Sequence, residues 1–240
     1  MSSASPDQKS TVLPGFRDPG VDLFLKIGGS LLQKLDACQE LAQTLERLAR
    51  THRLVLFPGG GPIDNYIESL DESLHFAPPI HHQLCARAQD QTGLIFGSFM
   101  ENAGYFTRLV ELGGLLAARR PAILLPAAMI LDLDVFEQSW KITSDTMAAY
   151  FAHLVRADRF AILTDVDGVY DDVNRPEDGV LSELPASRLL GRGRTAVDEC
   201  LPPFLLKHGL ACQVLNGFDV EAVESWITGT ARPGTAILPE

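Results

Sequence analysis

The stretch Val21-Asp-Leu-Phe-Leu-Lys-Ile-Gly-Gly-Ser30 decides the fold class. Residues 21–27 are mostly apolar and rich in strand-forming residues, and the glycine pair Gly28–Gly29 ends the run. Residues 33–50 then repeat apolar side chains three or four positions apart, with charged residues between them. That spacing predicts an amphipathic helix, so the segment reads as a buried strand that turns through glycines into a helix.

The rest of the chain repeats this alternation of strand and helix. Further strands are expected at residues 53–57, 122–125, 160–164, 212–215 and 235–238. Helices are expected at residues 62–70, 81–100, 103–119, 144–157, 197–208 and 219–228, and Pro202 and Pro203 put a break or a helix start inside 197–208. A proline-bearing loop is expected at 77–80 and an irregular, flap-like stretch at 171–195. This order predicts an α/β fold with a mainly parallel sheet covered by helices on both faces. Ligands of such sheets bind beyond the carboxyl ends of the strands.

Composition limits the classes of partner. The chain has 240 residues, which suits one fold with two lobes, and a formal net charge of −11. An acidic surface repels nucleic acid and anionic membranes, so we expect neither as a partner. Four scattered cysteines without metal or redox spacing indicate reduced thiols in a cytoplasmic protein. No apolar run is long enough to span a membrane, and residues 1–20 read as a disordered tail.

Two glycine turns follow predicted strands. Lys26 precedes Gly28, Gly29 and Ser30, and Gly59, Gly60 and Gly61 follow the strand at 53–57. Glycines let backbone N–H groups approach phosphate oxygens closely, and a helix that starts there adds positive potential. The alternative for each turn alone is a plain strand-to-helix connection. Together they indicate two facing anion cradles, and the ammonium of Lys26 is placed to reach a transferring phosphoryl group.

Polar residues also stand at other element ends. Thr143, Ser144 and Asp145 precede a helix, where they either cap it or orient Lys26 and a magnesium ion. Thr164-Asp-Val-Asp-Gly-Val-Tyr170 follows a strand and suits a ribose and a purine, with a tight turn as the alternative. Asp198 and Glu199 stand at the start of a helix, which the helix dipole alone favours. Trp140 is more typical of packing than of ligand stacking, and a metal role for His81 or His82 is disfavoured.

In order and spacing, these motifs resemble the amino acid kinase family, over about residues 21–238. The resemblance implies a three-layer α/β/α sandwich, with an acceptor lobe at about 21–130 and a nucleotide lobe at about 131–240. It implies ATP and Mg²⁺, a small-molecule phosphate acceptor and a homo-oligomer, with a dimer favoured over a hexamer.

The resemblance also implies residue roles. Lys26 and Asp145 are the catalytic pair, and Asp145 also acts on the metal through Mg-ATP. Gly59, Gly60 and Gly61 cradle the acceptor. The residues implied to hold the nucleotide are Lys26, Gly28, Gly29, Ser30, Thr143, Ser144, Thr164, Asp165, Asp167 and Tyr170.

Within the family, Ser139-Trp-Lys-Ile-Thr-Ser-Asp145 and Pro203-Phe-Leu-Leu-Lys207 resemble the kinases of methanofuran biosynthesis. These phosphorylate [5-(aminomethyl)furan-3-yl]methyl phosphate to its diphosphate. The resemblance adds His82 and Trp140 to the acceptor side. Many family members carry a second catalytic lysine near the position of Val197, whereas here Asp198 and Glu199 follow. We therefore expect Asp198 or Glu199 to pair with the aminomethyl cation of the acceptor.

Three alternatives stay open at this stage. The chain is a kinase of another phosphorylated or carboxylated metabolite, or it resembles the molybdenum storage proteins, which hold oxoanion clusters in this fold. The third alternative, a non-catalytic nucleotide sensor, draws its weight from the missing lysine. A residue after the triple glycine argues against isopentenyl phosphate kinases, which carry a histidine where this chain has Pro62.

Overall fold

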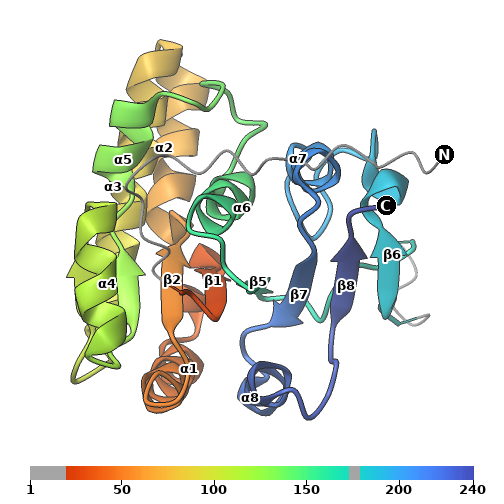
Figure 1. Ribbon diagram of the computed structural model, residues 1–240. Coiled ribbons are helices and arrows are strands. Elements are labelled where there is room, and N and C mark those ends of the chain that lie inside the picture. Colours follow the sequence, from red (N-terminus) through yellow and green to blue (C-terminus); the bar gives the residue numbers. More distant parts are fainter. Residues whose placement is uncertain (1–19, 173–178) are drawn as a thin grey trace, which may run out of the picture.

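The computed structural model describes residues 20–172 and 179–240, and these form an α/β structure around one twisted sheet (Figure 1). The sheet has eight strands in the order β3-β4-β2-β1-β5-β7-β8-β6. The strands are β1 (Leu23–Ile27), β2 (Leu54–Pro58), β3 (Gly104–Phe106), β4 (Ala122–Leu124), β5 (Arg159–Thr164), β6 (Glu183–Pro185), β7 (Cys212–Asn216) and β8 (Thr235–Leu238). All neighbours pair in parallel except β7 and β8, so the predicted mainly parallel sheet is confirmed.

Helices cover both faces of this sheet and give the three layers that were expected. They are α1 (Leu35–Leu48), α2 (Gly61–Leu74), α3 (Pro78–Gly97), α4 (Leu109–Ala117), α5 (Ala127–Leu133), α6 (Ser144–Leu154), α7 (Leu201–His208) and α8 (Val220–Thr228). The described residues also contain two short 3₁₀ helices, η1 (Gly29–Gln33) and η3 (Ala186–Leu189). Figure 1 shows α1 and α8 on one side of the sheet and α6 and α7 on the other.

The central strand β1 divides its side chains between the two faces, because successive residues of a strand point to opposite sides. Leu25 and Ile27 join the core beneath α1 and α8. Phe24 joins the other core, which includes Phe57 of β2 and Phe151 of α6. Lys26 is two residues after Phe24 and therefore projects on the α6 side, at the carboxyl end of the strand.

Three sequence expectations are corrected by the structure. Residues 103–119 are not one helix, because β3 precedes α4 and pairs with β4. The expected loop at 77–80 already contains the start of α3, since its prolines occupy a first turn that needs no N–H donor. The irregular stretch 171–195 contains β6 and η3, and its residues 173–178 lie outside the described part. The tail expected at 1–20 also lies outside it, apart from Gly20.

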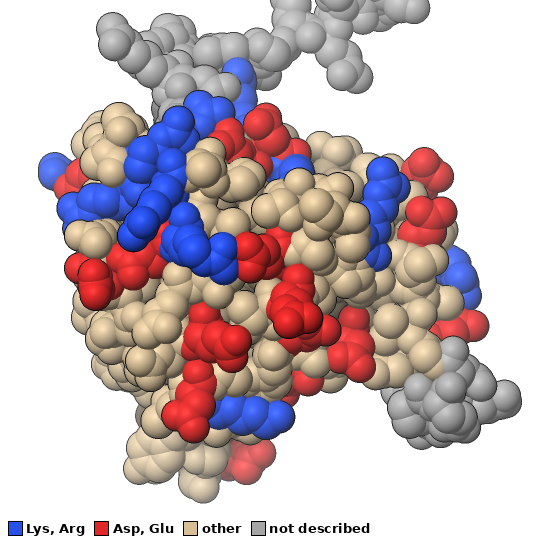
Figure 2. Space-filling model, turned by 90° about the horizontal axis from the view of Figure 1, so that it is seen from below, with Lys and Arg blue, Asp and Glu red and all other residues tan. Residues whose placement is uncertain are grey.

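Charge is unevenly spread over the surface. On the face seen from below, Figure 2 shows Lys and Arg gathered toward one end, while Asp and Glu are spread over the rest. Near the start of β4, Arg120 donates to the carbonyl of Asn102, and Glu46 accepts from the N–H groups of Glu101 and Asn102. These charged side chains therefore hold the loop that precedes β3. Within the described residues, no helix is long and apolar enough to cross a membrane.

Candidate active site

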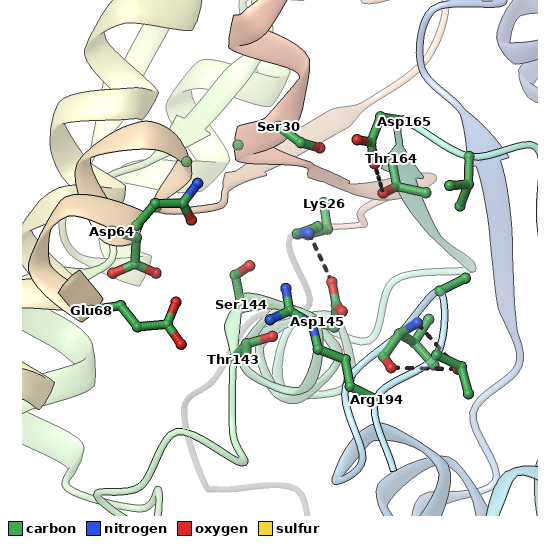
Figure 3. Close-up of a pocket in the computed structure, with 18 of the residues that line it drawn as sticks. Lys26, Ser30, Asp64, Glu68, Thr143, Ser144, Asp145, Thr164, Asp165 and Arg194 are labelled. Carbon is green, nitrogen blue, oxygen red and sulfur yellow. Dashed lines mark hydrogen bonds and ion pairs between the residues drawn. The ribbon is translucent and has the colours of Figure 1, made fainter. Parts of the chain in front are cut away.

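A pocket of ≈ 330 Å³ opens at the carboxyl ends of β1, β2 and β5 (Figure 3). It contains most of the residues that the sequence singled out. Those in its lining are Lys26, Gly29, Ser30, Gly60, Gly61, Trp140, Thr143, Ser144, Asp145, Thr164 and Asp165. The chain thus brings together four motifs that are far apart in the sequence, at the edge of the sheet where parallel folds bind ligands.

The two glycine turns are packed against each other, backbone to backbone. A Cβ atom added to Gly29 would lie 2.1 Å from the backbone nitrogen of Gly61. Gly61 has a φ of +61°, and a Cβ there would meet the carbonyl oxygen of Gly29 at 2.8 Å. Only glycine fits such contacts. The helices η1 and α2 begin at Gly29 and Gly61, and both glycines line the pocket. The first N–H groups of a helix have no partner inside it, so they are available to a ligand there.

The other two predicted glycines have a packing role. The N–H of Gly28 donates to the carbonyl of Leu163, and a Cβ on Gly28 would meet that oxygen at 2.7 Å. Gly59 donates to the carbonyl of Ile27, and its own carbonyl accepts from the buried hydroxyl of Thr92. Both residues lie outside the pocket lining. They hold the turns in place, whereas their glycine neighbours Gly29, Gly60 and Gly61 form the pocket wall.

Lys26 and Asp145 form a buried ion pair at the centre of the pocket. Nζ of Lys26 lies 2.8 Å from Oδ1 of Asp145, and each side chain is only about a tenth exposed (10% and 11%). Asp145 stands in the first turn of α6, which starts at Ser144. Lys26 therefore reaches the pocket from β1 with its ammonium held by a carboxylate. Figure 3 shows the pair between Asp64 and Glu68 on one side and Thr164 and Asp165 on the other.

Asp198 lies behind this pair, and its carboxylate is fully engaged by the protein. Its two oxygens accept six hydrogen bonds, from the N–H and hydroxyl of Thr143, the N–H and hydroxyl of Thr146, and the N–H groups of Cys200 and Leu201. The side chain is 2% exposed and is absent from the pocket lining. One carboxylate thus caps the starts of both α6 and α7, a role that Thr143 does not fill with its own side chain.

This geometry corrects the expectation for the acidic pair. Asp198 has no oxygen left for an acceptor cation, and its backbone N–H donates to Oδ2 of Asp145 at 3.1 Å. Asp198 therefore supports Asp145 and does not face the acceptor. Glu199 is exposed and forms an ion pair with Lys141 at 3.4 Å, outside the pocket lining. Neither acid occupies the place of a ligand to the acceptor.

Two of the residues expected at the nucleotide also lie outside the pocket lining. Asp167 accepts a hydrogen bond of 2.7 Å from the amide of Asn216, at the end of β7. Tyr170 forms an isolated bridge with Val180. Thr164 and Asp165 do line the pocket, next to Val166. The part of the pocket on the β5 side is therefore formed by the first residues after the strand.

His82 is buried, 5% exposed, and does not line the pocket. Its neighbour His81 has a clearer relation to the site, because its ring stacks on Trp140 with centroids 5.0 Å apart and planes 19° apart. Trp140 also donates from Nε1 to Oδ2 of Asp71, at 2.8 Å. Two contacts thus hold the Trp140 ring in the pocket lining, where the family resemblance, but not the residue type alone, places it.

Several lining residues were missed by the sequence reasoning. On α2 these are Asp64, Asn65 and Glu68, and after β5 and η3 they are Val166, Arg194, Thr195, Ala196 and Val197. The α2 acids follow the triple glycine by three and seven residues, so they fall on one helix face one turn apart. A helix that starts at a ligand-binding turn carries its first polar residues into the site, and that was the available signal.

The described residues do not build a metal cage of their own. Within residues 20–172 and 179–240, no group of three or more His, Cys, Asp or Glu side chains is arranged to hold an ion. Mg²⁺ commonly keeps its waters and binds through phosphate oxygens with one or two carboxylates. Of the carboxylates in the pocket lining, Asp145 is the one paired with Lys26, and this position fits a metal ion that would enter with a nucleotide.

Comparisons with known proteins agree with this geometry. A curated relative, the [5-(aminomethyl)furan-3-yl]methyl phosphate kinase of Methanocaldococcus jannaschii, is 32% identical over 217 residues, which is 90% of this chain and 97% of that protein. Among solved structures, the uridylate kinase of Archaeoglobus fulgidus matches with a TM-score of 0.71 and 20% identity, covering 90% of this chain and all (100%) of that one. The UMP kinase of Bacillus anthracis matches with a TM-score of 0.71 and 13% identity, covering 91% and 96%.

The sequence profile described as "Amino acid kinase family" matches residues 23–199. This span runs from β1, which carries Lys26, through the glycine turns and Asp145 to the loop that carries Asp198. The match covers well over half of the chain and all of the described motifs that meet in the pocket, up to Val197. The chain is therefore a kinase that belongs to the amino acid kinase family.

Proposed function

We propose that this kinase transfers the γ-phosphoryl group of ATP to the phosphate of [5-(aminomethyl)furan-3-yl]methyl phosphate and so forms the diphosphate. The observation that carries the proposal is the position of Lys26, whose ammonium lies in one pocket with two glycine turns in backbone contact. Such a pocket suits two phosphate groups brought end to end. The acceptor's identity is supported by a relative that matches along 90% of this chain and 97% of its own length.

The reaction needs positioning and charge neutralisation more than a covalent nucleophile. An oxygen of the acceptor phosphate forms a bond to the γ-phosphorus of ATP, and the bond from that phosphorus to the oxygen bridging the β-phosphate breaks. ADP leaves with the electron pair of that bond. The N–H groups at Gly29 and Gly61 bind the non-bridging oxygens, and Lys26 neutralises charge on the transferring group.

Asp145 has two tasks in this scheme. It holds the ammonium of Lys26 at 2.8 Å, and it contributes a carboxylate toward the magnesium ion of Mg-ATP. Magnesium, when bound, offsets phosphate charge and fixes the geometry of the phosphate chain. Ser144 and Thr143 at the start of α6 add polar groups beside the phosphates.

The two sides of the pocket then divide the substrates. We assign the acceptor to the lobe at about 21–130, which supplies α2, and the nucleotide to the lobe at about 131–240, which supplies Thr164 and Asp165. We assign the reaction to the cytoplasm, where ATP is abundant, and note that all four cysteines are free. The homo-oligomer implied by the family stays a prediction.

A coupled assay of ADP release with Mg-ATP tests the proposal. The panel holds the furan phosphate, UMP, isopentenyl phosphate, acetylglutamate and no acceptor. We expect release with the furan phosphate at a kcat/KM at least about 100-fold above that of any other acceptor, which corresponds to roughly 2.7 kcal/mol of discrimination. Faster ADP release with UMP would identify UMP as the acceptor instead. No ADP release with any acceptor, together with metal bound to the purified protein, would favour oxoanion storage.

A further inference from the structure

The pocket contains two carboxylates that phosphoryl transfer does not use. Asp64 and Glu68 lie one turn apart on α2, and both line the pocket. Carboxylates repel phosphate groups, so two of them are unfavourable in a site for two phosphorylated substrates unless a positive group is bound beside them. Figure 3 shows both side chains on the side of Lys26 away from Thr164 and Asp165. This is the side that we assign to the acceptor.

Asp64 is held directly against the acceptor's glycine turn. A Cβ atom added to Gly60 would lie 2.6 Å from Oδ2 of Asp64, so the carboxyl group fills the space beside that turn. Its other oxygen, Oδ1, is buried and accepts no hydrogen bond from the described residues. Burial raises the pKa of Asp64, and the nearby charge of Glu68 adds to the rise. A hydrogen bond with the side chain of Cys85 and the charges of Arg194 and His81 offset part of this effect. The protein thus holds a carboxylate without a full set of partners next to the acceptor.

An aromatic wall stands in the same pocket. Trp140 is 37% exposed and lines the pocket, while His81 stacks on its ring at 5.0 Å and Asp71 fixes its Nε1 at 2.8 Å. A ring held in place by two contacts loses little entropy when a flat ligand packs on it. Indoles also attract cations and aromatic rings.

We propose that Asp64 and Glu68 bind a protonated amine on the acceptor and that Trp140 packs against its ring, which makes this wall the determinant of acceptor specificity. The inference rests on the proposed function and deepens it. The acceptor class is a small phosphomonoester with a cationic group at the end opposite its phosphate. Asp64 and Glu68 thus have the role that the sequence analysis expected of Asp198 or Glu199, which is to pair with the acceptor's cation.

Magnesium is the competing ligand for two carboxylates. The geometry favours an amine, because Asp64 lies against the acceptor's turn at Gly60, whereas Lys26 and Asp145 stand at the centre of the pocket. Among the described residues, no group of three or more His, Cys, Asp or Glu side chains is arranged to hold a metal ion. An experiment can distinguish the amine from magnesium, because only the amine is part of the acceptor.

The test compares two acceptors that differ in the amine alone, the aminomethyl furan phosphate and its 5-methyl analogue. Affinity is read without ATP from quenching of tryptophan fluorescence, because Trp140 lines the pocket and the second tryptophan, Trp226, is buried against Arg159. We expect the wild-type protein to bind the amine at least about 30-fold more tightly than the analogue, the effect of roughly 2 kcal/mol from a charged pair.

Variants then assign the discrimination to residues. Asp64→Asn and Glu68→Gln are expected to raise the Kd and KM of the amine about 10- to 30-fold, leave the analogue within about twofold and leave the KM of ATP unchanged. Glu72→Gln is the matched control, because Glu72 lies one turn further along α2, exposed and outside the pocket lining. It should change none of these values.

Three results would overturn the inference. If the wild-type protein phosphorylates both furan compounds with equal KM, the amine is not recognised, although the proposed function stands. If Asp64→Asn raises the magnesium requirement and not the KM of the acceptor, the acids serve the metal. If the wild-type protein neither binds nor phosphorylates either furan compound, the proposed function and this inference fail together.

Discussion

The backbone N–H of Asp198 donates a 3.1 Å hydrogen bond to Oδ2 of Asp145, whose other oxygen pairs with Lys26. The carboxylate of Asp198 in turn caps the start of α6, which carries Asp145. The loop before α7 therefore fixes the position of the central ion pair. Asp198 lies outside the pocket lining, yet its hydrogen bonds fix the positions of Asp145 and Lys26 inside it.

This arrangement predicts that Asp198→Asn destabilises the whole protein. The amide replaces one acceptor oxygen with an N–H₂ group that faces N–H donors of Thr143 and Thr146 or of Cys200 and Leu201. Unsatisfied donors cost about 1–3 kcal/mol each, so we expect a loss of about 3 kcal/mol or more and a Tm lower by roughly 6–12 °C. Thermal unfolding measures it, with Glu199→Gln, an exposed neighbour, as the unaffected control. An unchanged Tm with a selective rise in acceptor KM would restore Asp198 as a direct ligand.

Lys26 is predicted to act on the transition state. Lys26→Met should lower kcat by about 100-fold or more, because the transferring charge loses its positive partner. The single variant also leaves Asp145 buried without its partner, which costs about 3–5 kcal/mol. The variant with both Lys26→Met and Asp145→Asn removes that charge and should recover much of the Tm while kcat stays low. A folded double variant with near-normal kcat would exclude Lys26 from the chemistry.

Because the glycine turns are in contact, we expect the single methyl group added by Gly29→Ala to lower activity strongly. Gly29→Ala places a Cβ 2.1 Å from the nitrogen of Gly61, so the turns must separate and both phosphate cradles distort. We expect kcat/KM to fall by about 100-fold or more for both substrates, since a small misplacement in phosphoryl transfer is costly. Gly113→Ala, where nothing lies within 4 Å on α4, is the control and should add about 0.5–1 kcal/mol of stability. Equal activity of the two variants would contradict the packed-turn description.

Asp64 gives a prediction about stability and pH. Burial raises its pKa, so the folded protein holds this proton more tightly than the unfolded chain does. Ionisation therefore works against folding at pH values above the unfolded carboxyl pKa of about 3.9. Asp64→Asn should raise the Tm at pH 8, and the gain should shrink toward pH 4.5 as the wild-type carboxyl is protonated. A lower Tm of Asp64→Asn at pH 8 would show that the ionised carboxylate stabilises the fold instead.

The fold was predictable because its central elements are local patterns. The run from Val21 to Ile27, the glycine turns and the helix at 33–50 each follow from propensity and periodicity, and the strands at β1, β2, β4, β5, β7 and β8 lie where those patterns place them. The strands β3 (Gly-Tyr-Phe) and β6 (Glu-Leu-Pro) were missed, because neither has the unbroken apolar run that marks β4 (Ala-Ile-Leu), a strand of the same length. Their pairing with β4 and β8 is decided by tertiary contact.

The site was predictable in part for a similar reason. Lys26, Gly29, Gly61 and Asp145 stand at element ends, and the topology of a parallel sheet brings such ends together. Asp198 was predicted to be a ligand because an acid near a helix start can either cap the helix or bind a ligand. The hydrogen bonds that distinguish these roles are visible only in the structure. Asp64 and Glu68 were missed because acidic residues on an amphipathic helix are usually exposed to solvent. Their position in the pocket depends on the neighbouring glycine turn, which only the structure locates.

The proposed phosphoryl transfer can be followed by ³¹P NMR after incubation of the protein with Mg-ATP and [5-(aminomethyl)furan-3-yl]methyl phosphate. We expect the acceptor's single phosphomonoester signal to be replaced by the two coupled doublets of a diphosphate, in step with the formation of ADP. An unchanged phosphomonoester signal while ATP is hydrolysed, or a diphosphate formed from UMP instead, would contradict this proposal.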